Sequence, residues 1–179
     1  MLIHKAIEFA AIRHKDQKRK GTELPYIVHP MEVMQILTEN GCDEIVIVAG
    51  ILHDTIEDTE TTYDDILENF GKEIADIVAS ESEDKSKSWK ERKQTTIDRL
   101  PNESFETQLV CCADKLSNLR SMLSDYQKVG EKLWKRFRSD RENNKWYYNG
   151  IIESLTSLKD YNMYQELKDT FQALFLNKI

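Results

Sequence analysis

Turn-forming residues are scarce in this sequence, since its 179 residues include 6 glycines and 3 prolines. An all-β protein of this length would need many more, because each connection between strands requires a turn and these residues favour turns. Apolar and polar side chains do not alternate convincingly over four or more residues, with 25–28 as the one weak exception. The composition therefore predicts an all-α fold.

Long apolar runs are also missing. The longest, Ile45 to Leu52, is far shorter than the roughly 20 residues that a membrane-spanning helix needs. The first five residues lack the basic-then-apolar layout of a signal peptide. Of the three cysteines, Cys111 and Cys112 are adjacent, which makes a poor disulfide framework and suggests a reducing compartment. We therefore expect no membrane association and a cytoplasmic location.

The sequence has no broad excess of positive charge, because its formal net charge is −7. This argues against a general nucleic-acid-binding protein, which would present a basic face. One dense basic segment covers residues 13–20. It is either a solvated helix end or a contact for an anionic small molecule. The lysines at 15 and 18 are assigned to the solvated face.

Domain boundaries are equally absent. The 40% apolar and 32% charged content is typical of a globular protein, and no repeat, linker or low-complexity tract interrupts the chain. A chain of this length forms one ordinary domain with its own core. We predict a single domain over 1–179, in which 125–179 form a helical tail packed on the same core.

Helix start and stop signals divide the chain. Thr62 with Asp65, and Ser88 with Glu91, have the spacing of capping boxes. Asp43 suits an N-cap position. Predicted helices cover 3–14, 29–40, 43–57, 62–71, 72–80, 88–100 and 104–125, with two or three more within 131–177 and breaks near Gly130 and 139–144.

The most informative segment delivers His53, Asp54, Glu57 and Asp58 directly after an apolar helix. On a continuous helix these four side chains share one face. Three neighbouring carboxylates repel one another, and a divalent cation would compensate their charge. Mixed nitrogen and oxygen donors suit Mn²⁺, Fe²⁺ or Zn²⁺ better than Ca²⁺. The simpler alternative is a capped helix end with a solvated acidic turn.

An adjacent His-Asp pair cannot fill a coordination sphere, so a metal site needs ligands from elsewhere in the chain. His29 lies between an apolar stretch and Pro30, at the start of a predicted helix. Asp114 follows the apolar segment 109–113, where an unpaired carboxylate would be costly. A metal would compensate that charge, and Lys115 or Arg120 is the simpler partner.

Together these residues resemble a known family. His29, then His53-Asp54, then Asp114 is similar to the H…HD…D signature of the HD metal-dependent phosphohydrolase superfamily. Further blocks resemble the hydrolase domain of RelA/SpoT proteins, and the similarity covers roughly 3–125. These blocks are 9–11, 14–20, 25–30, 52–59, 70–71 and 113–120. The chain therefore looks like a stand-alone small alarmone hydrolase with the compact multi-helix HD-domain bundle.

The resemblance implies a role for each matching residue. The four signature residues would hold a metal ion, usually Mn²⁺ in this family. Glu57 and Asp58 match an acidic pair that positions and activates the attacking water. Arg19 and Lys20 match a basic pair near the substrate, and Asn118 matches a nucleotide-contacting asparagine. The implied reaction removes the 3′-pyrophosphate from guanosine tetra- or pentaphosphate and leaves GDP or GTP.

Two other functions stay open. The first is an HD phosphohydrolase that acts on another phosphorylated nucleotide, such as an adenosine alarmone, a 5′-nucleotide or a deoxynucleoside triphosphate. The second is a non-catalytic nucleotide-binding regulatory module, which loss of a ligand would favour.

The remaining features receive structural interpretations. The aromatic residues of 134–148 are assigned to the core or to contacts in a homo-oligomer, and Cys111 and Cys112 to packing. His4 and His14 are taken as ordinary helix residues, and the acidic segment 82–85 as a loop that borders the site.

Overall fold

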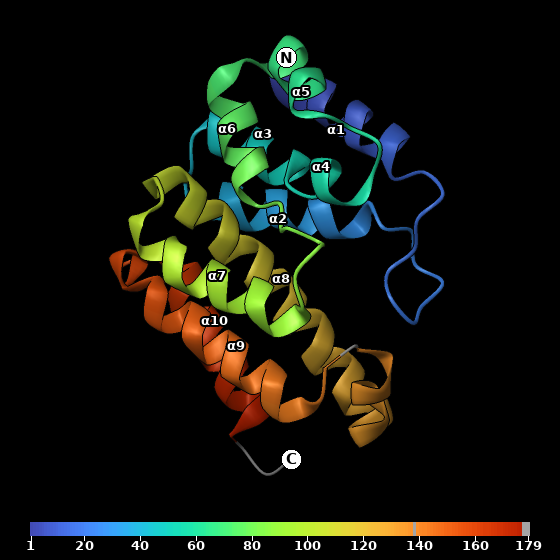
Figure 1. Ribbon diagram of the computed structural model, residues 1–179, viewed down its shortest axis with the longest axis vertical. Coiled ribbons are helices and arrows are strands. Elements are labelled where there is room, and N and C mark those ends of the chain that lie inside the picture. The colour runs from blue at the N-terminus through green and yellow to red at the C-terminus, as the bar shows by residue number, and fades with distance from the viewer. Residues whose placement is uncertain (138, 177–179) are drawn as a thin grey trace.

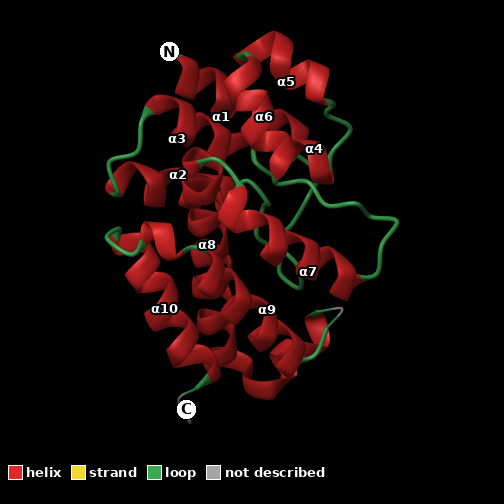
Figure 2. Cartoon of the chain, turned by 60° about the vertical axis from the view of Figure 1, so that its left-hand side comes forward, coloured by secondary structure: helices red, strands yellow, loops and turns green. Residues whose placement is uncertain are grey.

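The chain folds entirely into helices and loops. The computed structural model describes residues 1–137 and 139–176, and these residues contain no β-strand, only an isolated bridge between Lys18 and Pro25. Figure 2 shows the helices stacked along the long axis of the molecule. The all-α prediction is confirmed. Within the described residues, no helix combines the length and apolar character needed to cross a bilayer.

The α-helices are α1 (Leu2–Arg13), α2 (Val28–Glu39), α3 (Glu44–Leu52), α4 (Thr55–Asp58), α5 (Tyr63–Phe70), α6 (Lys72–Ser80), α7 (Trp89–Arg99), α8 (Phe105–Val129), α9 (Arg141–Ser154) and α10 (Asn162–Phe175). The longest connections without a helix lie between α1 and α2 and between α6 and α7. Short 3₁₀ helices cover Leu100–Asn102, Gly130–Arg136 and Thr156–Leu158.

The predicted caps are present. The Asp43 side chain accepts a hydrogen bond from the Val46 backbone N–H at the start of α3. Both capping boxes form reciprocally, Thr62 with Asp65 before α5 and Ser88 with Glu91 before α7. These short-range signals set the helix starts because they satisfy backbone donors that the first turn leaves unpaired.

The prediction that one helix runs from Asp43 to Glu57 is wrong. Helix α3 ends at Leu52, and a turn separates it from α4. Side chains satisfy the last carbonyls of α3, since His53 Nδ1 lies 2.8 Å from the Gly50 oxygen and the Thr55 hydroxyl donates to the Leu52 oxygen at 2.6 Å. The helix therefore stops without leaving those groups unpaired.

Two other boundaries differ from the prediction. Helix α8 continues to Val129 instead of 125 and ends at Gly130, whose φ of 57° favours glycine. The predicted end of the last helix at 177 lies outside the described residues.

Helix α8 is the centre of the molecule. Figure 1 shows α1 to α6 at one end and α7, α9 and α10 at the other, with α8 between them, and α8 packs against α2, α3, α6 and α10. Helices α2 and α3 approach closely, because a Cβ at Gly50 would lie 2.4 Å from Leu37 Cδ1. Buried apolar residues from α1 to α10 form one connected cluster, as a single folding unit requires.

Most of the aromatic residues in 134–148 belong to this cluster. Trp134, Tyr147 and Tyr148 are buried, whereas Trp146 is only partly buried. Cys111 and Cys112 are buried as well. Packing therefore accounts for these residues.

Candidate metal centre and active-site cleft

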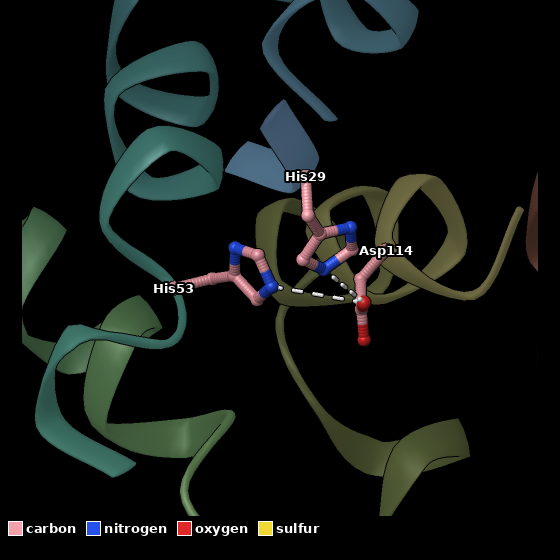
Figure 3. Close-up of side chains that lie close together, drawn as sticks. All are labelled: His29, His53 and Asp114. Atoms are coloured by element: carbon pink, nitrogen blue, oxygen red, sulfur yellow. Dashed lines mark ion pairs between the residues drawn. The ribbon is translucent and has the colours of Figure 1, made fainter. Parts of the chain in front are cut away.

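Four predicted ligands converge beside the middle of α8. His29 comes from the first turn of α2, His53 and Asp54 from the turn after α3, and Asp114 from α8. Figure 3 shows both imidazoles directed at the Asp114 carboxylate, whose Oδ1 lies 3.0 Å from His29 Nε2 and 3.6 Å from His53 Nε2. Asp54 Oδ2 lies 2.9 Å from His53 Nε2 and 3.5 Å from His29 Nε2. We call these four residues the ligand cluster.

The donor atoms fit a divalent cation. Two donors that each lie about 2.1 Å from one ion are about 3.0–3.4 Å apart, and the four nitrogen–oxygen distances in the ligand cluster run from 2.9 to 3.6 Å. The donor atoms of His29, His53 and Asp114 all lie within 4.8 Å of one another. His53 donates its Nδ1 proton to the Gly50 oxygen at 2.8 Å, so its Nε2 faces the carboxylates, where it either carries a proton or binds a cation. That buried nitrogen has no hydrogen-bond partner. Electron-rich atoms that face one another without a donor require a cation or a proton.

The electrostatics of the metal-free cluster point the same way. Burial works against ionisation throughout it, but Asp54 and Asp114 outweigh burial and hold the pKa of His53 well above its usual value. Burial lowers the pKa of His29. The pKa values of Asp54 and Asp114 lie well below the usual range despite burial, Asp54 chiefly because of His53 and Asp114 chiefly because of Lys115. Both carboxylates are therefore ionised and available as ligands.

Asp114 has a second partner. Lys115 forms an ion pair with Asp114 Oδ2, so the simpler alternative from the sequence is realised at one oxygen. The other oxygen, Oδ1, faces the histidines and accepts a hydrogen bond from Asn118 Nδ2 at 2.5 Å. One oxygen of this carboxylate thus pairs with Lys115, and the other faces the histidines. Arg120 does not contact Asp114 but pairs with Glu32 and Glu166.

The carboxylate of Asp54 is held by Tyr26, a residue that sequence reasoning did not single out. The Tyr26 hydroxyl donates to Asp54 Oδ2 at 2.6 Å. Burial, and then Asp54, raise the pKa of Tyr26, so this hydroxyl stays protonated and remains a donor. His14 lies just beyond α1 instead of within it, is buried, and has its ring centroid 4.9 Å from that of Tyr26.

His29 also has an outer partner that the sequence did not reveal. Its Nδ1 lies 2.8 Å from the Ser117 hydroxyl, and Ser117 donates to Glu32 at 2.9 Å. Both partners stand one helical turn beyond a ligand, Glu32 three residues after His29 and Ser117 three after Asp114. That i, i+3 spacing was the available signal.

Glu57 and Asp58 stand beside the ligand cluster on α4. Burial, followed by repulsion from Asp58, raises the pKa of Glu57 to about 7. Lys85, from the loop after α6, hydrogen-bonds to the Glu57 backbone oxygen and lies 3.3 Å from Asp58 Oδ1. The predicted acidic pair is thus adjacent to the cluster, and the loop of 82–85 borders it as expected.

A cleft of about 660 Å³ adjoins the cluster, since His29 and Asp58 are among the residues that line it. The predicted basic pair, Arg19 and Lys20, lines it together with Asn118. Further cations come from α8 and the segment after it. They are Arg120, Lys128 and Arg136. The size and charge of the cleft suit a phosphorylated small molecule.

The cleft and the cluster are connected. Arg19 Nη2 donates to Asn118 Oδ1 at 2.9 Å, and Asn118 Nδ2 donates to Asp114 Oδ1. Asn118 therefore joins a basic side chain of the cleft to a predicted metal ligand. Lys20 lies over the Phe137 ring, with its Nζ 5.4 Å from the centroid.

Comparison with known proteins gives several matches. A family model described as an HD domain matches residues 6–141. The guanosine-3′,5′-bis(diphosphate) 3′-pyrophosphohydrolase MESH1 of Homo sapiens is 43% identical over 173 residues, which cover 95% of this chain and 90% of the human protein. The protein of the same name from Xenopus tropicalis is 44% identical over 124 residues, covering 68% of this chain and 69% of the frog protein.

Solved structures agree with these matches. One, described as a metazoan ortholog of SpoT that hydrolyzes ppGpp and plays a role in starvation responses, has a TM-score of 0.80 at 28% identity, with coverage of 96% of this chain and 94% of that chain. The crystal structure of lmo0812 from Listeria monocytogenes EGD-e has a TM-score of 0.78 at 37% identity, with coverage of 83% and 99%. The likeness extends over the whole fold.

Proposed function

Because the chain belongs to the HD-domain family, and within it to the family that contains the MESH1 pyrophosphohydrolases, we propose that it is a hydrolase that removes the 3′-pyrophosphate of guanosine tetra- or pentaphosphate. The products are GDP or GTP and pyrophosphate. One observation carries this proposal: His29, His53, Asp54 and Asp114 converge, and His29 also lines a cleft with several basic side chains.

In this proposal the ligand cluster holds one divalent cation, with Mn²⁺ as the metal. Imidazole and carboxylate donors suit that ion. When bound, it would lower the pKa of a water molecule and polarise a phosphoryl oxygen. The geometry that supports this role is His53 Nε2, which faces Asp54 Oδ2 at 2.9 Å and Asp114 Oδ1 at 3.6 Å.

The chain's own groups divide the remaining work. Glu57, with a pKa of about 7, is ionised in part near neutral pH and is suited to accept a proton from the attacking water. Asp58, next to Glu57, forms an ion pair with Lys85 at 3.3 Å. Arg19 presents a planar fork and Lys20 a point charge to the phosphates. Asn118 lies between Arg19 and Asp114, where it can contact the nucleotide.

The location, the partners and the domain organisation follow from the composition of the sequence. We propose that the protein acts in the cytoplasm on a small nucleotide, without nucleic-acid or membrane partners, as one domain over 1–179. The free cysteines support a reducing compartment. For Cys112, burial raises the pKa of the thiol above its usual value, which favours a packing role over redox chemistry.

The test is a turnover panel. The purified protein, freed of metal and then supplied with Mn²⁺, is incubated with ppGpp and pppGpp, adenosine alarmones, 5′-nucleotides and deoxynucleoside triphosphates, and the products are separated by chromatography. We expect GDP or GTP and pyrophosphate from the guanosine alarmones, and no turnover after chelation. Faster hydrolysis of another nucleotide on the panel would identify that nucleotide as the substrate instead. Metal binding without turnover of any panel member would refute the enzymatic role.

A further inference from the structure

A carboxylate lines the cleft where it would repel a polyanion. Glu32 stands on α2 at the wall of the cleft, with its side chain 31% exposed. Two other carboxylates share this wall, and each has an evident reason to be there. Asp58 belongs to the acidic pair, and Asp125 lies 2.7 Å from Arg136 Nη1. Glu32 therefore requires a reason of its own.

The hydrogen bonds of Glu32 lead to a predicted metal ligand. The Ser117 hydroxyl lies 2.9 Å from Glu32 Oε2 and 2.8 Å from His29 Nδ1. A hydroxyl has one proton, and an ionised carboxylate can only accept. Ser117 must therefore donate to Glu32, and it can then only accept from His29. The hydrogen bonds therefore have one direction: His29 Nδ1 donates to Ser117, and Ser117 donates to Glu32.

This direction decides which nitrogen of His29 binds. A ring that donates from Nδ1 carries its free electron pair on Nε2, the atom that faces Asp114 at 3.0 Å. We propose that Glu32, acting through Ser117, is a positioning residue that holds His29 in the orientation and tautomer needed for a metal ion. The inference rests on the proposed metal site and not on the identity of the substrate.

The two histidines differ in how they are held. His53 Nδ1 bonds to the backbone oxygen of Gly50, which no substitution removes. His29 depends on two side chains, so its support can be removed one step at a time. Outer partners of this kind typically change metal affinity by about 10- to 100-fold.

The second carboxylate oxygen of Glu32 also has a partner, which links it to α10. Arg120 Nη1 lies 3.4 Å from Glu32 Oε1, and Arg120 donates from Nε and Nη2 to Glu166 of α10, each at 2.8 Å. The chain of contacts thus runs from α10 to the ligand cluster. Because each step is further from His29, the effect of a substitution should decrease from Ser117 to Glu32 to Glu166.

The experiment measures Mn²⁺ binding without substrate, by calorimetric titration of the metal-free protein. We expect Ser117→Ala and Glu32→Ala to weaken Mn²⁺ binding by about 10- to 100-fold, and Glu166→Ala by less than about 10-fold. Glu32→Gln keeps an acceptor for Ser117 and should restore part of the affinity. Glu39→Ala is the matched control, because Glu39 is exposed on the same helix and accepts a hydrogen bond from Gln35.

Activity measurements distinguish a residue that positions His29 from one that contacts the substrate. Saturating Mn²⁺ should return Glu32→Ala to near wild-type kcat. The substrate KM should not rise, since the substitution removes a negative charge from the cleft wall. Far-ultraviolet circular dichroism checks the fold, and Glu32→Ala decides the matter if the buried Ser117→Ala fails to fold. Equal Mn²⁺ affinity in wild type, Glu32→Ala and Glu39→Ala would overturn the inference. A wild type that binds no divalent metal would instead overturn the proposed site.

Discussion

The ligand cluster and the cleft beside it are built in opposite ways. The side chains of His29 and His53 are 1% exposed and that of Asp114 is 6% exposed, and each is held by further hydrogen bonds. Lys18 lines the cleft, although the sequence assigned it to the solvated face; by contrast with the cluster it is 56% exposed and pairs with Glu23, itself 89% exposed. A buried, fully connected polar group keeps one arrangement, whereas an exposed charge adapts to its ligand.

This difference predicts a division of labour. Charges in the buried cluster act at low local dielectric and are scarcely screened by salt. Charges in the cleft act through water and weaken with ionic strength. The cluster should therefore decide whether the reaction occurs, and the cleft how well the nucleotide binds. Three substitutions test this division, and a fourth tests the cost of a buried charge near the cluster.

The largest effect should come from the cluster itself. Asp114→Asn keeps the volume but removes the charge that faces both histidines. We expect loss of bound metal and of measurable turnover, because the metal's contribution is worth several kcal/mol. Metal content by mass spectrometry and the ppGpp assay check this. Asp169→Asn, at an exposed position of α10, is the control. Turnover near the wild-type rate in Asp114→Asn would remove Asp114 from the ligand set.

The next effect should come from the edge between cluster and cleft. Glu57→Gln should lower kcat by about 10²- to 10⁴-fold, the usual loss when a general base is removed, while Mn²⁺ affinity stays near wild type. Single-turnover kinetics and metal titration measure the two quantities. Glu60→Gln, an exposed neighbour, should behave as wild type. A kcat within threefold of wild type in Glu57→Gln would assign proton transfer elsewhere.

The cleft should give a smaller, different response. Arg19→Ala should raise the substrate KM by about 10- to 100-fold, because a charge-assisted hydrogen bond is worth roughly 1.5–3 kcal/mol. It should also flatten the dependence of KM on salt. Initial rates at several NaCl concentrations test both. Lys15→Ala, in the same basic segment but outside the cleft wall, is the control. A change in kcat alone would contradict the division between cluster and cleft.

The smallest effect concerns pH. Burial raises the pKa of Glu81 to about 7, above its usual 4.5, so the folded protein binds more protons than the unfolded chain between these values. Stability should then fall as pH rises through that window. Glu81→Gln should be more stable than wild type at pH 8 by about 1 kcal/mol, with no difference below pH 4.5. Urea unfolding of the metal-free proteins measures this. Equal stability at pH 8 would show that Glu81 is ionised without cost.

Local signals predicted much of this structure. Caps such as Asp43 and Thr62 act within one turn, so the sequence alone places the helix starts. The break at His53 was missed because it depends on two side chains that bond to carbonyls of α3. Helix propensity does not predict where side-chain hydrogen bonds to the backbone end a helix. The ligand types and the Lys115 partner of Asp114 could be predicted, but the Tyr26 contact could not.

What the sequence determined by itself is the inventory: an all-helical chain, a His-Asp pair after an apolar helix, and a histidine and an aspartate placed where an unpaired polar group would be costly. The tertiary structure alone decided that these four residues meet. Helices α2, α3 and α8 bring together positions up to 85 residues apart, counted from His29 to Asp114. Packing of these helices also orders the outer contacts, from Glu32 to His29, since hydrogen-bond direction depends on which groups face one another in space.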